Sequence, residues 1–255
     1  MASDSRSLSA RLRSSPAATL WRRGRHVELM HRAMGFAALG FLTLVPLLIV
    51  VAGAVPGTGE SFGRWLGQAL GVTEPSRIRV ESLFGAGNEA LERTTAFGLA
   101  ALTVFGLTFG GAVQTGYERI WDLPPARWHT LWRHVVWLAL VIGWLGVLVL
   151  VPGTVWGAGV DLLLTVGFFW GSQWLLLAGR VRWRALFPGA VATAVGLLGL
   201  RVFSQLVFSP LIASSAVTYG PFGTLLAVQS WLVGVGFVVH GGALVGRLLA
   251  ARRPG

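Results

Sequence analysis

The chain has 255 residues, of which 54% are hydrophobic and only 12% are charged, and its formal net charge is +11. Soluble domains carry about twice that charged fraction, so the composition excludes a disordered chain and argues against a soluble enzyme. With 35 glycines and no cysteine, the sequence fits a polytopic membrane protein without disulfides or thiolate metal sites.

The N-terminal region divides into two expected segments. Residues 1–18 are predicted to be a disordered basic N-terminus, and residues 19–32 an amphipathic helix on the cytoplasmic surface. Leu20, Val27 and Met30 of this helix are suited to dip into lipid headgroups while its arginines meet anionic lipid. The alternative is that residues 19–32 simply extend the first membrane span.

Charge-free windows predict the membrane-spanning helices, since about 20 apolar residues cross the hydrocarbon core. Six such windows predict an all-α fold, a bundle of six transmembrane helices forming one domain over residues 33–249. The expected helices cover approximately residues 33–57, 94–117, 135–158, 162–179, 186–212 and 223–247. A long external loop, residues 58–93, follows the first helix, and residues 250–255 form a short basic tail.

The arginines predict the orientation. All 21 basic residues are arginine, and 16 of them lie in the N-terminal segment, the second and fourth connections and the C-terminal segment. Basic residues concentrate on the cytoplasmic side, so we expect a multi-pass membrane protein with both termini in the cytoplasm. No soluble domain is large enough to carry a basic face, so nucleic acid is not an expected partner.

Ionisable residues inside spans are candidate functional residues. Arg201 lies toward the external side of its span, and it either contacts an anionic group in a cavity or extends outward to the membrane surface. Gln205, one turn further on, is expected on the same face. His240 is either a hydrogen-bonded packing residue or a proton relay. Pro46 interrupts the first span, where it either kinks the helix or frees a backbone carbonyl to face a cavity.

No catalytic residue is expected. His26, Glu28 and His31 spread around a helix instead of converging on one face, so no metal site is predicted. The sequence contains neither a nucleophile elbow nor a phosphate-binding loop. We therefore expect no cofactor and no enzymatic activity.

Three blocks of sequence resemble the YihY/BrkB virulence factor family. They are residues 33–53, residues 113–133 and residues 217–249, the last with Tyr219, Gly220, Gly223 and Trp231. The sequence departs from the family pattern in two places: Tyr117 and Glu118 stand where the family often has asparagine, and Ala243 stands where it usually has glutamate.

The resemblance implies a six-helix inner-membrane protein that supports cell-envelope integrity, in a family associated with movement of envelope lipids. An older description of the family as a ribonuclease is not supported, because no cluster of acids or histidines is present to hold two metal ions. Three functions stay open: handling of an anionic envelope lipid, a non-transporting scaffold that recruits envelope proteins, and a membrane-embedded enzyme. Membrane lipids, envelope proteins and a second copy of the chain are the expected partners.

Overall fold

The computed structural model describes residues 16–54, 77–79, 95–126, 131–150, 153–219 and 221–251. Most of the predicted N-terminal segment, external loop and basic tail therefore lie outside the described residues. Within them the chain is all-helical and contains no strand. The prediction of an all-α fold is confirmed for this part of the chain.

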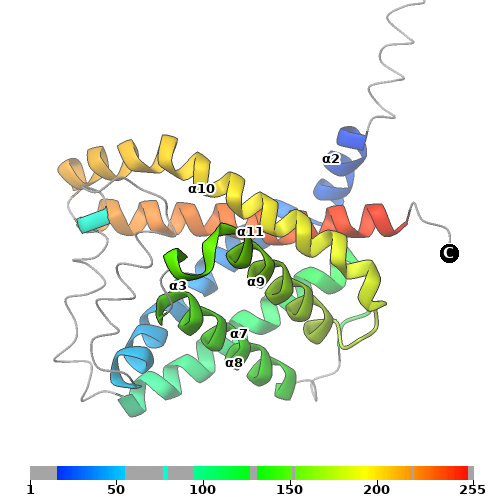
Figure 1. The fold of residues 1–255 in the computed structure, drawn as a ribbon, viewed down its shortest axis with the longest axis horizontal. Helices are drawn as coiled ribbons and strands as arrows, with labels where there is room; N and C mark the ends of the chain where they lie inside the picture. Colours follow the sequence, from blue (N-terminus) through cyan, green and yellow to red (C-terminus); the bar gives the residue numbers. More distant parts are fainter. Residues whose placement is uncertain are drawn as a thin grey trace, which may run out of the picture.

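Seven helices of eleven residues or more follow one another in the described residues, which also include a short helical segment at residues 77–79 (Figure 1). They are α2 (Pro16–His26), α3 (Leu29–Ala54), α7 (Thr95–Ile120), α8 (Leu131–Leu150), α9 (Gly153–Leu176), α10 (Trp183–Tyr219) and α11 (Pro221–Ala250). Three segments are long and apolar enough to cross a membrane: Phe97–Ile120, Trp183–Val207 and Phe222–Ala250. Shorter apolar stretches cover Leu29–Leu44 and Leu131–Val147.

The segment predicted as one amphipathic helix, residues 19–32, is divided in the structure. Helix α2 ends at His26, and Glu28 adopts a left-handed backbone conformation with φ of 55°. Val27 is 2% exposed and packs into the core, and its carbonyl accepts a hydrogen bond of 2.8 Å from Arg32 Nε. The chain therefore turns at Val27, and residues 29–32 belong to α3.

The six long helices form a closed ring. The principal contacts run α3–α7–α8–α9–α10–α11 and return from α11 to α3. Figure 1 shows α10 and α11 side by side along one edge, with both chain ends of the described bundle on the same side. Two further contacts, α7 with α9 and α7 with α11, cross the ring. These crossing contacts close one end of it.

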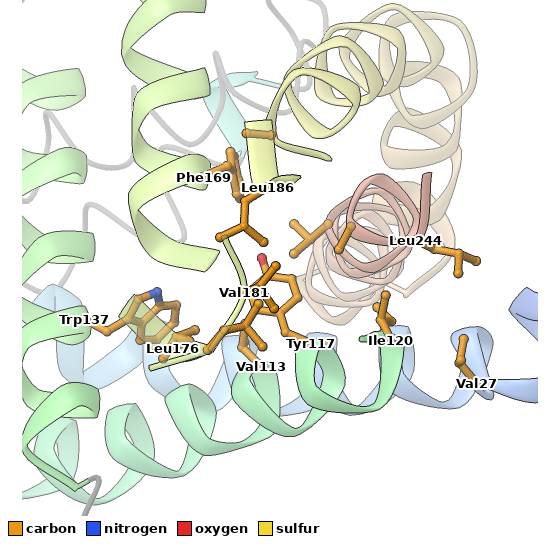
Figure 2. Packing of buried hydrophobic residues seen from close by; sticks show 14 residues of the cluster. Val27, Val113, Tyr117, Ile120, Trp137, Phe169, Leu176, Val181, Leu186 and Leu244 are labelled. Carbon is orange, nitrogen blue, oxygen red and sulfur yellow. The ribbon is translucent and has the colours of Figure 1, made fainter. Parts of the chain in front are cut away.

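The packed core lies at this closed end (Figure 2). Tyr117 and Ile120, at the end of α7, are at most 1% exposed. They share one buried cluster with Leu176 at the end of α9, Leu186 at the start of α10 and Leu244 near the end of α11. Close packing of this kind holds membrane helices together, since lipid tails are as apolar as the side chains.

Small residues bring α10 and α11 together. A Cβ atom on Gly246 would lie 2.6 Å from the Cα atom of Gly189, and one on Gly242 would lie 2.8 Å from the backbone nitrogen of Thr193. Real side chains do not tolerate such distances, so the two backbones approach through glycine. This is the small-residue packing typical of membrane helices.

We predict that Gly242→Ala lowers the stability of the bundle by about 1–3 kcal/mol, because the new methyl group overpacks the α10–α11 contact. Gly241→Ala is the matched control, since a Cβ atom there would meet nothing within 4 Å. Thermal unfolding in mild detergent, followed by circular dichroism, measures both variants. Equal unfolding temperatures for the two would contradict this packing.

Candidate functional site: a central cavity above a closed end

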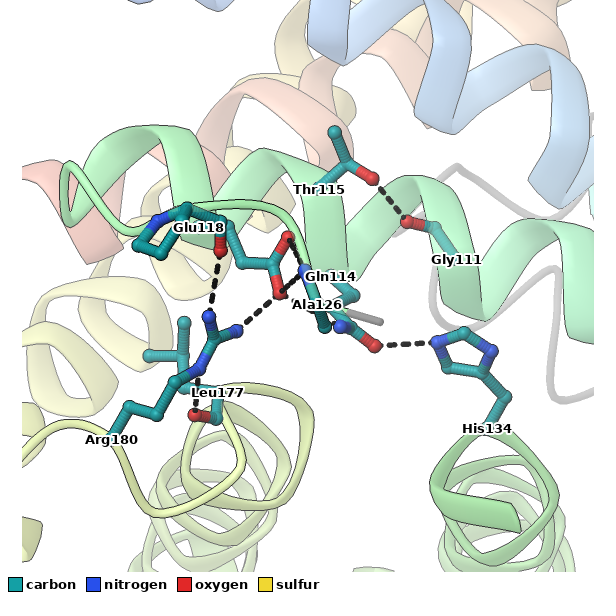
Figure 3. A network of polar contacts seen from close by, with 9 residues as sticks. Gly111, Gln114, Thr115, Glu118, Ala126, His134, Leu177 and Arg180 are labelled. Atoms are coloured by element: carbon teal, nitrogen blue, oxygen red, sulfur yellow. Dashed lines mark hydrogen bonds and ion pairs between the residues drawn. The ribbon is translucent and has the colours of Figure 1, made fainter. Parts of the chain in front are cut away.

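A buried carboxylate organises the polar contacts at the closed end (Figure 3). Glu118, in the last turn of α7, is 4% exposed. It accepts a hydrogen bond of 2.8 Å from Gln114 Nε2 and one of 3.2 Å from the backbone nitrogen of Ala126. Arg180 forms an ion pair with it. Buried charges need such partners, because desolvation is costly when a charge stands alone.

This Glu118 network (Gln114, Glu118, Ala126, His134 and Arg180) joins four segments. Arg180, in the turn between α9 and α10, also donates to the backbone carbonyls of Pro124 at 2.7 Å and Leu177 at 3.1 Å. His134 Nε2 lies 2.6 Å from Gln114 Oε1 and extends the network to α8. The network therefore ties α7, α8, the segment after α7 and the α9–α10 turn together.

A second polar cluster lies beside the chain ends. Arg247 of α11 donates to the carbonyl of Ile120 and to the carboxylate of Asp122, which Arg23 of α2 approaches to 3.9 Å. The hydrogen bond from Arg247 holds the pKa of Asp122 below its ordinary value of 3.8. Since Asp122 is largely exposed, we regard this cluster as a connection between α2, α7 and α11 and not as a buried site.

A cavity of about 480 Å³ lies inside the ring. All six long helices contribute to its wall, which is mainly apolar and aromatic. The aromatic lining residues include Phe36, Phe109, Trp137, Trp144, Phe168 and Trp231. A volume and a lining of this kind are typical of sites for small organic ligands.

The cavity is elongated along the helices. Its wall includes Ser172, which lies four residues before the end of α9, and Arg201, which lies 18 residues after the start of α10. At 1.5 Å per residue, these positions are about 6 Å and about 27 Å from the closed end. The cavity therefore extends over about 20 Å from the packed core toward the opposite end of the ring.

The uncharged polar groups of the wall are mostly satisfied. Ser172 accepts a hydrogen bond from the indole nitrogen of Trp137, and Thr165 donates to the carbonyl of Asp161 at 2.8 Å. The indole nitrogens of Trp144 and Trp231 have no partner in the described part of the chain. The cavity thus offers few free polar groups along its length.

Two charged side chains line the cavity, Asp161 of α9 and Arg201 of α10. Within the described residues neither side chain makes an ion pair or a hydrogen bond with a protein group. They belong to neighbouring helices and lie far from the closed end. Both charges are therefore available to a ligand.

The sequence-predicted site residues divide between the wall and its surroundings. Arg201 lines the cavity, whereas Gln205, Pro46 and His240 are not part of its lining. Arg201 and Gln205 are both exposed, but four residues along a helix turn the Gln205 side chain about 40° further round, away from the lining. Pro46 is buried, but its neighbours Leu44 and Leu47 line the cavity in its place.

His240 lies behind the wall. It is 2% exposed, and its Nδ1 atom lies 2.8 Å from the carbonyl oxygen of Gly236. Its ring packs 5.9 Å from that of Tyr117 and 6.0 Å from that of Phe36, and both of these residues line the cavity. A Cβ atom on Gly116 would collide with the histidine ring. His240 thus fills the contact between α7 and α11.

Sequence reasoning missed three residues of the site. Asp161 falls between the expected helices 135–158 and 162–179, and Arg180 belongs to the basic connection that follows residue 179. Glu118 was excluded from the second span, which was ended at residue 117. The signal was present, because an acid directly continuous with an apolar helix is a functional candidate. In the described residues, no group of three or more His, Asp or Glu side chains is arranged to hold a metal ion.

We predict that Glu118→Gln destabilises the protein by about 2 kcal/mol, because Arg180 loses its ionic partner. Glu28→Gln removes an exposed carboxylate and should change stability by at most about 0.5 kcal/mol. The double variant Glu118→Gln/Arg180→Gln should lose less than the two single variants together. Additive losses in thermal unfolding would contradict the proposed pairing.

A pH dependence follows from Asp122. Its pKa is lowered in the folded protein, so its pairing stabilises fully above the ordinary value of 3.8 and is lost as the pH falls through the lower folded value. The difference in unfolding temperature between the wild type and Asp122→Asn should be constant from about pH 8 to about pH 5 and disappear near about pH 2. A difference that persists undiminished in acid would exclude this pairing as its origin.

The comparison with protein-family models identifies the family. The family model described as Virulence factor BrkB matches residues 20–254, which is nearly the whole chain. No curated protein and no solved structure gives a significant match. The match includes every helix from α3 to α11, and therefore the cavity and its closed end. The chain belongs to the BrkB virulence factor family of membrane proteins.

Proposed function

We propose that this BrkB-family protein crosses the bacterial plasma membrane six times, has both termini in the cytoplasm, and supports envelope integrity by moving a phosphate-bearing lipid through its central cavity. Helices α3, α8 and α9 have 20 residues or more, which supports adding them to the three clear spans. Twenty helical residues are about 30 Å long and match the hydrocarbon core. The closed end, with both chain ends and most arginines, then faces the cytoplasm.

The single observation that carries this proposal is the elongated apolar cavity. One leaflet occupies half of the hydrocarbon core, or about 15 Å. A cavity about 20 Å long, lined by aromatic and aliphatic side chains, has room for the length of an acyl chain. We infer that the acyl chain lies along the cavity, with its methyl end near Tyr117 and Ser172.

The surface beside the cavity supports entry from the bilayer. Leu198 lines the cavity and is also 49% exposed. On the same helix Val202 is 59% exposed, and on α9 Leu163 is 71% exposed. An apolar surface of this kind faces lipid in a membrane protein. This surface supports the approach of a lipid to Leu198, and through it to the cavity, from the apolar part of the bilayer.

Arg201 supplies the cation for the lipid phosphate. It lies at the end of the cavity opposite the packed core and makes no contact with a protein anion in the described residues. A guanidinium group binds phosphate through paired hydrogen bonds. In this arrangement the acyl chain points toward the closed end and the headgroup toward the outer surface.

We predict that Val141→Trp, which fills the cavity, reduces lipid movement about tenfold or more. In the assay, the protein is reconstituted into vesicles that contain a fluorescent phospholipid, and a membrane-impermeant quencher is added outside. The quencher removes the fluorescence of lipid in the outer leaflet, so further loss of fluorescence reports movement of lipid from the inner leaflet. Val136→Trp is the matched control: the same substitution on the same helix, at a residue that is 44% exposed and outside the lining.

The same pair of variants separates the alternative functions. A scaffold that only recruits envelope proteins would keep full envelope-protective function in cells with Val141→Trp, and the wild type would not move lipid in vesicles. A chemically altered lipid in the mass spectrum of the vesicles would favour a membrane-embedded enzyme. Either result would overturn the proposal.

We further predict that Arg201→Gln weakens phospholipid binding about tenfold, because a charge-assisted hydrogen bond to the phosphate is lost. Arg201→Lys keeps the charge and should retain most of the binding. Native mass spectrometry of the detergent-purified protein gives the bound lipid. Full binding and full envelope protection by Arg201→Gln would remove the phosphate role from Arg201.

A further inference from the structure

The cavity has charges of both signs. Asp161 and Arg201 are the charged lining residues in the described part of the chain, and no nitrogen of Arg201 lies within ion-pair distance of an Asp161 oxygen. The formal charges of the described lining residues therefore sum to zero. A ligand bound by Arg201 alone would place its negative charge in the field of the Asp161 carboxylate, which opposes binding.

The two residues lie at similar heights in the ring. Asp161 is 15 residues before the end of α9, and Arg201 is 18 residues after the start of α10. The helices are antiparallel neighbours joined by a short turn, so these positions are about 22 Å and about 27 Å from the closed end. The offset of about 5 Å suits a headgroup whose two opposite charges are separated by a short bridge.

We propose, on the basis of the lipid-binding function above, that the cavity selects a zwitterionic phospholipid whose headgroup carries a primary ammonium group. The phosphate binds Arg201, and the ammonium group donates hydrogen bonds to Asp161. A net-anionic glycerol headgroup has no ammonium group to pair with Asp161, so the Asp161 carboxylate and the lipid phosphate repel each other. A quaternary ammonium headgroup carries the charge but has no N–H group to donate.

The surroundings of the pair favour this selection. Leu162, Leu198 and Leu200 line the cavity beside it, and Arg201 is itself exposed. The pair therefore lies where the apolar cavity meets the surface, which is where the headgroup of a lipid with its acyl chain in the cavity would lie. The ion pair of Glu118 with Arg180 is already satisfied at the closed end and is not part of the lining. We therefore assign the choice of headgroup to Asp161 and Arg201.

The test is a competition measured by native mass spectrometry. The full chain, delipidated in mild detergent, is offered an equimolar mixture of dioleoyl phosphatidylethanolamine, phosphatidylglycerol and phosphatidylcholine. The wild type should bind phosphatidylethanolamine most, and Asp161→Asn should reduce its ratio to phosphatidylglycerol about tenfold. Asp161→Glu, which keeps the carboxylate, should retain the preference. Asp122→Asn, the same change outside the cavity, should leave the ratio unchanged.

The outcomes distinguish the two proposals. An unchanged ratio in Asp161→Asn, or a wild type that prefers phosphatidylglycerol, would overturn the headgroup selection. Equal binding of phosphatidylcholine and phosphatidylethanolamine would overturn the role of the primary ammonium group. If the wild type binds no more of any lipid than Val141→Trp does, the lipid-binding function itself fails. Unfolding temperatures measured on the same samples establish that each variant is folded.

Discussion

The closed end of the ring depends on the ion pair between Glu118 and Arg180. Glu118 is buried at the last turn of α7, and its carboxylate meets donors from α7, from the segment after it and from the α9–α10 turn. Leaving such a carboxylate unpaired would be costly, so these segments must converge. Their convergence brings α7 across the ring to α9 and α11, and the largest buried side chains gather there.

The same convergence explains why the ring is hollow elsewhere. Helix α7 crosses toward α9 and α11 at the closed end, and the six helices otherwise contact mainly their neighbours in the ring. Aromatic side chains reduce the space but leave about 480 Å³. Because one end of the ring is packed and the rest is hollow, the two ends of the cavity differ. In the proposed function this difference orients the lipid, with the acyl chain toward Tyr117 and the headgroup toward Asp161 and Arg201.

Much of the fold could be predicted from the sequence, because apolar windows of helical length mark helices whatever their neighbours. The turn at Val27 could not, since it depends on burial of that side chain against the bundle. Arg201 was identified because a cation within an apolar window is conspicuous. The proximity of Arg201 to Asp161 along the ring could not be identified from the sequence, because it depends on how α9 and α10 pack against each other. The cavity is formed by six helices together, so the position of a residue within its own helix does not decide whether it lines the cavity. For this reason the sequence could not show that Gln205, Pro46 and His240 lie outside the lining.

The central claim, that an acyl chain lies inside the ring, is most directly tested by photocrosslinking. A phospholipid with a photoreactive group near the end of one acyl chain is reconstituted with the protein, and tandem mass spectrometry locates the attached residues. The account predicts attachment to lining residues of several helices near the closed end, such as Val113, Trp137 and Ser172. Attachment confined to exposed side chains outside the lining, such as Phe97, Leu163 and Leu226, would contradict it.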